Sequence, residues 1–521
     1  MKTTSLFALA ATAGLALSMG SGVAADLGGN CCADLEERIA DLEATAARKG
    51  NRKVSLTIYG QLNRTITYLD DGQIRKTYFG NDNTNSSSRF GFTGEAKISS
   101  AWKAGFDIMI EIEAGGTTSK ASQLDEDGKL GTQFGGNNSA LGASASYNAS
   151  NVDAYFGDAR HAAFWLEHDR LGRFTLGRWE SAGAAQGIDL AGIQSTAASA
   201  SFSLINGFTF FRSKASGSLT TIRVGDLGDP AAAMGRTELL RWDSPTLHGF
   251  IASASIGESG DFWGAMLRYA NEFNGVRIAG GIGYEQSRDR ATTACVAGTG
   301  NITQTACSIT PGANGGIAVG AQGYNGFDSD IVGRPNVGAF GIAGAILHVP
   351  TGLFAQGHWN KVTYAGDPNG YWGYGSLTNA ADKKHDMTHW LIQSGLSRNH
   401  FGIGVTSLYG EYGKVSGIGG ESGLGRAFTA PNNSVAGSFD QIAAITNSEL
   451  RIWGIGLVQD VDAAAMKLYL GYRNFSGSVT QGGNGVFAAT GTTCATNANT
   501  ACAFNGLKDI NMITAGGLIK F

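Results

Sequence analysis

The chain has 521 residues, of which 78 are glycine and 7 are proline, with 16% charged residues and a net charge of −4. A membrane-spanning helix needs about twenty apolar residues in a row, and no such run follows the N-terminal segment. No basic block supports nucleic-acid binding. Abundant glycine and weak, alternating hydropathy are typical of a transmembrane β-barrel, and a secreted β-solenoid is the alternative with similar composition.

The first 25 residues have the parts of a secretory signal peptide. Lys2 supplies a positive charge, residues 6–19 are apolar, and residues 23–25 offer a small-residue cleavage site after either alanine. The apolar stretch is too short to span a bilayer. The segment predicts an exported protein.

Residues 33–49 form the one convincing helix of the sequence. Leu35, Ile39 and Leu42 recur at heptad spacing, with charged residues around them. Two heptads are marginal alone, so the pattern favours a self-associating coiled coil within an N-terminal segment over 26–53. The alternative is a lone helix packed on its own barrel.

From residue 54 onward, apolar and polar residues alternate in sixteen segments, as in strands whose side chains point to opposite faces. The predicted strands cover 54–69, 89–99, 102–113, 159–168, 173–180, 236–243, 250–258, 262–274, 276–287, 337–349, 351–363, 388–398, 402–414, 449–459, 466–476 and 510–521.

Short and long connections alternate between these strands. Links such as 99–101 and 274–275 are short, whereas 114–158 and 181–235 are long and polar. An even strand number with short turns at one end and long loops at the other is the layout of an outer-membrane barrel. The sequence therefore predicts an all-β transmembrane barrel of 16 antiparallel strands over 54–521, closed by its last strand.

Six cysteines remain in the predicted mature chain. Export favours disulfides within two pairs that are close in sequence, Cys295 with Cys307 and Cys494 with Cys502. Histidines and carboxylates are missing beside them, so no metal site is expected there. Cys31 and Cys32 leave two alternatives open, lipidation and intermolecular disulfides. The sequence also lacks the G-x-S-x-G and H-E-x-x-H motifs, so no catalytic residues are expected.

Several short segments, in this order, resemble the porins of alphaproteobacteria. Their order makes the resemblance specific, and it spans nearly the whole mature chain. The segments are Leu35-Glu-Glu-Arg-Ile-Ala-Asp-Leu42, residues 47–56 with Gly60-Gln61, Arg89-Phe-Gly-Phe-Thr-Gly94, Arg160-His-Ala-Ala-Phe-Trp-Leu-Glu167, Leu171-Gly-Arg-Phe-Thr-Leu-Gly-Arg178, Arg241-Trp-Asp-Ser-Pro245 and the terminal aromatic Phe521.

The resemblance implies a homotrimer in the outer membrane, in which each barrel is a water-filled pore for passive diffusion of small hydrophilic solutes and ions. It implies no cofactor and no enzymatic activity. The expected partners are outer-membrane lipids, lipopolysaccharide and the barrel-assembly machinery, which would recognise Phe521 as an assembly signal. The N-terminal helix would lie in the periplasm, and the mature N-terminus would be tethered to peptidoglycan, as in some relatives. A substrate-specific channel on the same barrel is the alternative function.

The resemblance also implies that the third outer loop, over 181–235, folds inward and narrows the pore, where opposed charges set permeation. The candidate wall residues are Arg64, Arg89 and Arg178. Arg89 is the best of them because it lies opposite the apolar face of its strand, whereas the other two share a face with apolar neighbours and could instead meet the trimer contact. The acids of the loop are Asp189, Asp226 and Asp229.

Overall fold

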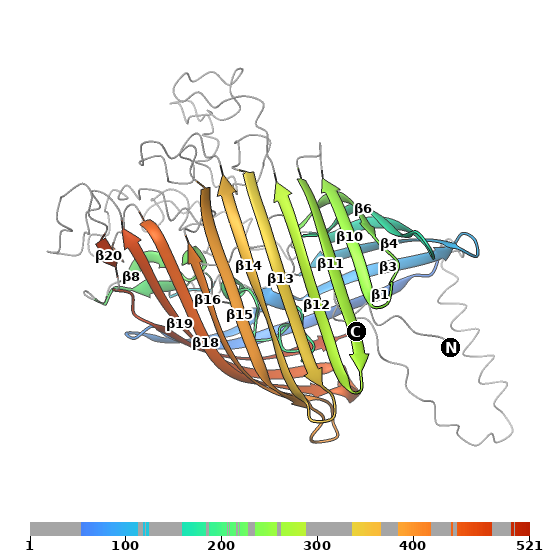
Figure 1. Ribbon diagram of the computed structural model, residues 1–521. Helices are drawn as coiled ribbons and strands as arrows, with labels where there is room; N and C mark the ends of the chain where they lie inside the picture. The colour runs from blue at the N-terminus through green and yellow to red at the C-terminus, as the bar shows by residue number, and fades with distance from the viewer. Residues whose placement is uncertain are drawn as a thin grey trace, which may run out of the picture.

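The computed structural model is a closed antiparallel β-barrel (Figure 1). It describes residues 54–112, 118–119, 121–123, 159–183, 187–205, 207, 209–214, 217, 219–227, 235–257, 262–287, 336–365, 384–417, 439–440, 445–481, 502–504 and 506–521. The predicted signal peptide and N-terminal helix lie outside these ranges. Among the described residues, no helix has the length and apolar character to cross a membrane.

The main sheet has 18 strands, of which 16 make the ring because β2 and β20 only extend it. The ring strands are β1 (Thr57–Asp70), β3 (Arg89–Lys97), β4 (Trp102–Glu111), β5 (Ala159–His168), β6 (Gly172–Glu180), β9 (Arg236–Asp243), β10 (Phe250–Gly257), β11 (Phe262–Phe273), β12 (Val276–Ser287), β13 (Asn336–His348), β14 (Leu353–Ala365), β15 (Lys384–Arg398), β16 (Thr406–Gly417), β18 (Ile445–Val461), β19 (Met466–Gln481) and β21 (Ile510–Lys520). The predicted count of sixteen is confirmed.

The remaining strands lie at the end of the barrel that carries the long loops. β2 (Arg75–Asp82) folds back on β1, and β20 (Cys502–Phe504) pairs with β19. A separate three-stranded sheet joins β7 (Phe210–Arg212), β8 (Leu219–Arg223) and β17 (Phe439–Asp440). The sequence analysis missed these short strands because they lack the alternating apolar pattern of a lipid-facing wall.

The barrel closes where the first strand meets the last. Gln61 lies opposite Lys520, and the antiparallel register runs on to Asp70 opposite Asn511. Just before it, the N–H of Gly60 donates to the carbonyl of Phe521 at 2.9 Å, and the N–H of Phe521 donates back at 3.1 Å. Closure leaves no open sheet edge, as a bilayer requires, and the predicted pairing is confirmed.

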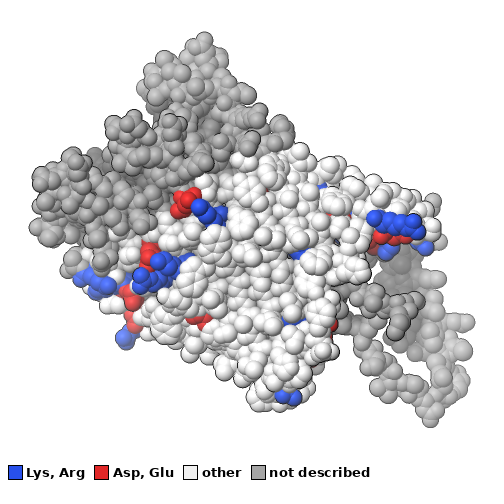
Figure 2. Space-filling view, in the orientation of Figure 1, with Lys and Arg blue, Asp and Glu red and all other residues white. Residues whose placement is uncertain are grey.

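Side chains of β1 alternate between lumen and exterior. Tyr59 and Asn63 are buried, whereas Ile58, Leu62 and Ile66 are 61%, 44% and 46% exposed. An exposed apolar row is stable where lipid covers it. Figure 2 shows a broad outer surface with few charged side chains, most of them near its margins.

The observed strands differ from the predicted ones mainly at the long-loop end. β15 and β18 each begin four residues before their predicted starts at 388 and 449, and β19 ends five residues after 476. Apolar alternation marks only the part of a strand that faces lipid, whereas the hydrogen-bonded ladder continues beyond it. β16 begins four residues after 402 because residues 401–404 bend within the turn.

Candidate functional site

The third loop spans residues 181–235, and in its described part it contacts the inner wall of the barrel. The N–H of Leu190 donates to Gln356 Oε1 on β14 at 3.2 Å. Further along, Gln393 Nε2 on β15 donates to the carbonyl of Ala198 at 2.9 Å. The loop is therefore held against the inner wall of the barrel, and the predicted inward fold is confirmed for its described residues.

The second part of the third loop carries an apolar plug, which we define as Phe202, Ile205, Phe211, Ile222, Val224 and Leu227. These side chains are at most 2% exposed. They pack against lumen-facing residues of the nearby strands, namely Leu391, Val415, Leu450, Ile452, Phe475 and Met512. An apolar contact of this kind offers no polar lining, so a path for ions must follow another part of the wall.

A buried ion pair anchors the loop beside the plug. Arg473 Nε and Nη2 on β19 each contact a carboxylate oxygen of Glu411 on β16 at 2.8 Å, and these side chains are 6% and 1% exposed. Arg473 Nη2 also donates to the carbonyl of Ser199 at 3.0 Å. This pair therefore links two strands to the turn that precedes Phe202.

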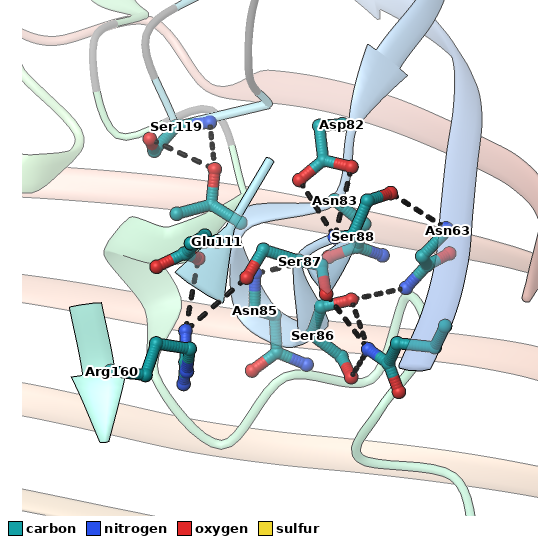
Figure 3. Close-up of polar contacts among 12 residues, drawn as sticks. Asn63, Asp82, Asn83, Asn85, Ser86, Ser87, Ser88, Glu111, Ser119 and Arg160 are labelled. Carbon is teal, nitrogen blue, oxygen red and sulfur yellow. Dashed lines mark hydrogen bonds and ion pairs between the residues drawn. The ribbon is translucent and has the colours of Figure 1, made fainter. Parts of the chain in front are cut away.

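A second segment, residues 83–88 of the first outer loop, also folds into the lumen (Figure 3). Ser199 Oγ of the third loop donates to Asn85 Oδ1 at 2.8 Å, and Gln61 Nε2 of β1 donates to Ser86 Oγ at 2.9 Å. The sequence analysis missed this segment. Its signal was a run of asparagine and serine directly before Arg89, which short polar turns often use.

A row of charged side chains lines the lumen on β3, β4, β5, β6 and β9, which the plug does not cover. Arg89 lies opposite Gln61 on β1 and Glu111 on β4 in the strand register, and both of these face inward. Arg160 Nη1 contacts Glu111 Oε1 at 2.9 Å and donates to Ser87 Oγ at 3.2 Å (Figure 3). Within the described part of the chain, the Arg89 guanidinium makes no hydrogen bond or ion pair.

We call this group the charged wall. Its members lie on β3, β4, β5, β6 and β9 and interact electrostatically with one another. They are Arg89, Asp107, Glu111, Arg160, His161, Glu180 and Arg236. A wall of mixed charge beside an inward-folded loop can attract hydrated ions of either sign and discriminate between them.

Two of the three predicted wall residues face away from the lumen. Arg64 lies between the exposed Leu62 and Ile66, and its Nη1 donates to the carbonyl of Gly80 at 3.1 Å. Arg178 lies opposite the exposed Ala162. Both arginines share the outward face with their apolar neighbours, so their predicted place at the constriction is wrong, and Arg89 is the predicted arginine that faces inward.

The loop acids have different positions. Asp189 Oδ1 accepts from Gln356 Nε2 at 3.1 Å, and its Oδ2 accepts from the N–H of Gln194 at 2.8 Å. Asp226 lies in the 3₁₀ turn Gly225–Leu227 beside the plug. Asp229 lies outside the described residues. Of these acids, Asp189 is therefore the one whose contacts place it in the lumen.

The predicted disulfides fall largely outside the described part of the chain. Cys295, Cys307 and Cys494 are not among its residues, and Cys502 begins β20. Both pairings stay predictions.

The barrel also brings together two histidines that lie 31 residues apart. His358 Nε2 on β14 lies 3.4 Å from each ring nitrogen of His389 on β15. Within the described ranges, no group of three or more His, Cys, Asp or Glu side chains is arranged to hold a metal ion.

Comparison with solved structures returns porins over most of the chain, at low identity. The anion-selective porin from Comamonas acidovorans is 12% identical, with 90% of this chain and 100% of that chain covered and a TM-score of 0.46. OmpF of Salmonella typhi, in complex with daunomycin, is 11% identical, with 90% and 98% covered and a TM-score of 0.40. No curated protein matches the sequence.

The family comparison covers more than half of the chain. A model described as Gram-negative porin matches residues 5–371, which include the first eleven strands of the ring, the third loop and the charged wall. The chain therefore belongs to the Gram-negative porin family, and it is an outer-membrane channel for passive diffusion.

Proposed function

We propose that small hydrophilic solutes and ions cross this barrel through a passage between the charged wall and the third loop. The observation that carries the proposal is the division of the lumen. Apolar side chains of the plug pack against inward-facing apolar residues of β15, β16, β18, β19 and β21, whereas charged side chains line β3 to β6. Ions follow polar walls.

The charges also support a field across the passage. Arg89 lies on β3, and Asp189 is hydrogen-bonded to Gln356 on β14. These strands are nine positions apart in one direction around the ring of sixteen and seven in the other, so they lie on opposite sides. A cation on one side and an anion on the other would orient dipolar solutes as they pass.

A homotrimer is part of the proposal. Arg64 on β1 and Arg178 on β6 face outward among apolar side chains. An arginine facing lipid near the bilayer midplane costs about 2–4 kcal/mol, and a neighbouring protomer would remove that cost. The resemblance to alphaproteobacterial porins supports the same assembly, a periplasmic N-terminal helix and contacts with lipopolysaccharide, the barrel-assembly machinery and peptidoglycan.

Planar-bilayer recording of the purified protein tests the channel. We expect stepwise conductance increments that rise with salt concentration and need no added substrate, because the conductance of a passive pore increases with the concentration of ions. A membrane that stays non-conducting with correctly folded protein, identified by heat-modifiable gel mobility, would refute the proposed function. A low-concentration solute that blocks the steps would instead favour the substrate-specific alternative.

A further inference from the structure

His161 lies at the centre of the charged wall and contacts a carboxylate with each ring nitrogen. Its Nδ1 lies 2.9 Å from Asp107 Oδ1 on β4, and its Nε2 lies 2.8 Å from Glu180 Oε1 on β6. The residue is 4% exposed, and its ring packs against that of Trp179 at an angle of 34°, with 4.1 Å between ring centroids. The imidazole therefore has a fixed orientation between two acids.

This geometry can accommodate a proton on both ring nitrogens. A neutral imidazole has one N–H donor and one acceptor, so one of its nitrogens would direct a lone pair at a carboxylate. Asp107 also contacts Tyr59, whose Oη lies 2.9 and 2.8 Å from the two carboxylate oxygens. The two contacts suit an imidazolium, which can donate to both acids.

The position of Glu180 connects this network to the pore. Glu180 is the last residue of β6, and the third loop begins at the next residue. In the strand register Glu180 lies opposite Arg236, the first residue after the loop. The contact between His161 and Glu180 therefore positions the end of β6, from which the third loop enters the lumen.

We propose that His161 sets the ion selectivity of the channel and positions the root of the third loop. This inference rests on the proposed passage along the charged wall. While His161 is protonated, it neutralises carboxylate charge and leaves the neighbouring arginines to favour anions. Loss of that proton removes one positive charge, so the preference moves toward cations as pH rises. The other titratable or charged groups that face this network are Tyr59, Arg89, Glu111, Arg160 and Arg236.

Reversal potentials in a potassium chloride gradient test the proposal on the purified protein, between about pH 5 and about pH 9, the range that brackets histidine titration. For the native protein, the chloride-to-potassium permeability ratio should fall about twofold as pH rises, the size expected for one unit charge acting through several ångströms of water. His161→Gln should hold the low ratio at every pH. His161→Arg keeps a charge and several donors, so it should hold the high ratio.

The control is His400→Gln, because His400 lies in an exposed turn outside the lumen. The permeability ratio of this variant should change with pH as that of the native protein does. A native ratio that is constant with pH, or a His161→Gln channel that keeps the native pH dependence, would overturn the role of His161.

If the His161→Gln variant does not assemble, Glu180→Gln replaces it. Removing one carboxylate should lower the pH midpoint, and an unchanged midpoint contradicts the proposal. Absence of any conductance in the native protein would refute the channel itself.

Discussion

The two sides of the lumen are built from the same kind of alternating strands but differ in their inward-facing residues. On β15 to β21, inward-facing residues such as Leu391 and Ile452 are apolar and are covered by the plug. On β3 to β6, inward-facing residues such as Arg89 and Glu111 are charged and are covered by no apolar residue of the plug. In this barrel, the inner face therefore carries mainly apolar residues where the plug rests on it and charged residues on β3 to β6, which the plug does not cover.

The largest stability effect is expected on the plug side. Arg473→Ala would leave the Glu411 carboxylate buried without its cation, and removing one partner of a buried ion pair costs about 3–5 kcal/mol. We expect a lower unfolding temperature in detergent, which heat-modifiable gel mobility measures. The control is Arg451→Ala on the neighbouring strand, whose pair with Glu449 has a 56% exposed arginine. An exposed pair is worth at most about 1 kcal/mol. Equal effects of the two variants would contradict a buried anchor.

A smaller loss is expected where the plug meets the first outer loop. Arg212 Nε contacts Asp71 Oδ2 at 2.7 Å, and the Asp71 side chain is fully buried. A hydrogen bond to a charged group contributes about 1.5–3 kcal/mol, so Asp71→Asn should loosen the β7–β8 hairpin. Faster amide hydrogen exchange over 210–223 would report this.

The control for that change is the preceding residue. Asp70 pairs with Arg75, whose side chain is 74% exposed, at 3.0 Å. Asp70→Asn should therefore leave exchange in the hairpin unchanged. If both aspartate variants accelerate exchange equally, the buried contact is not what holds the hairpin.

The smallest stability effect is expected on the charged wall. Arg89 makes no ion pair or hydrogen bond with its guanidinium among the described residues. Arg89→Gln should therefore change the unfolding free energy by less than about 0.5 kcal/mol. It should still lower the chloride-to-potassium permeability ratio about twofold, since one cation leaves the passage.

Reversal potentials measure this shift, with Arg277→Gln as the control because its 47% exposed side chain pairs with Glu272 beside a short turn. A selectivity unchanged by Arg89→Gln would mean that solutes do not pass along this wall. A large loss of stability would mean that the wall is structural.

Alternation along the strands was enough to predict the barrel and its faces. It placed Arg89 on the inward face. Arg64 and Arg178 were also predicted at the constriction, but they face outward, as their apolar neighbours on the same face had indicated. The alternation also contained a signal that the sequence analysis did not use. β18 is apolar on both faces, with Leu450 and Ile452 inward and Trp453 and Ile455 outward, and a strand of this kind is covered on both sides.

The sequence by itself determined the sixteen strands, their faces and the closing pair, because the bilayer imposes a period-two pattern on every strand and forbids a free edge. Only the tertiary structure decided which inward residues meet. His161 reaches Asp107 and Glu180 through the registers of β4, β5 and β6, and Arg473 reaches Glu411 across β18. Strand registers and the course of the third loop depend on contacts between distant residues, which local alternation does not contain.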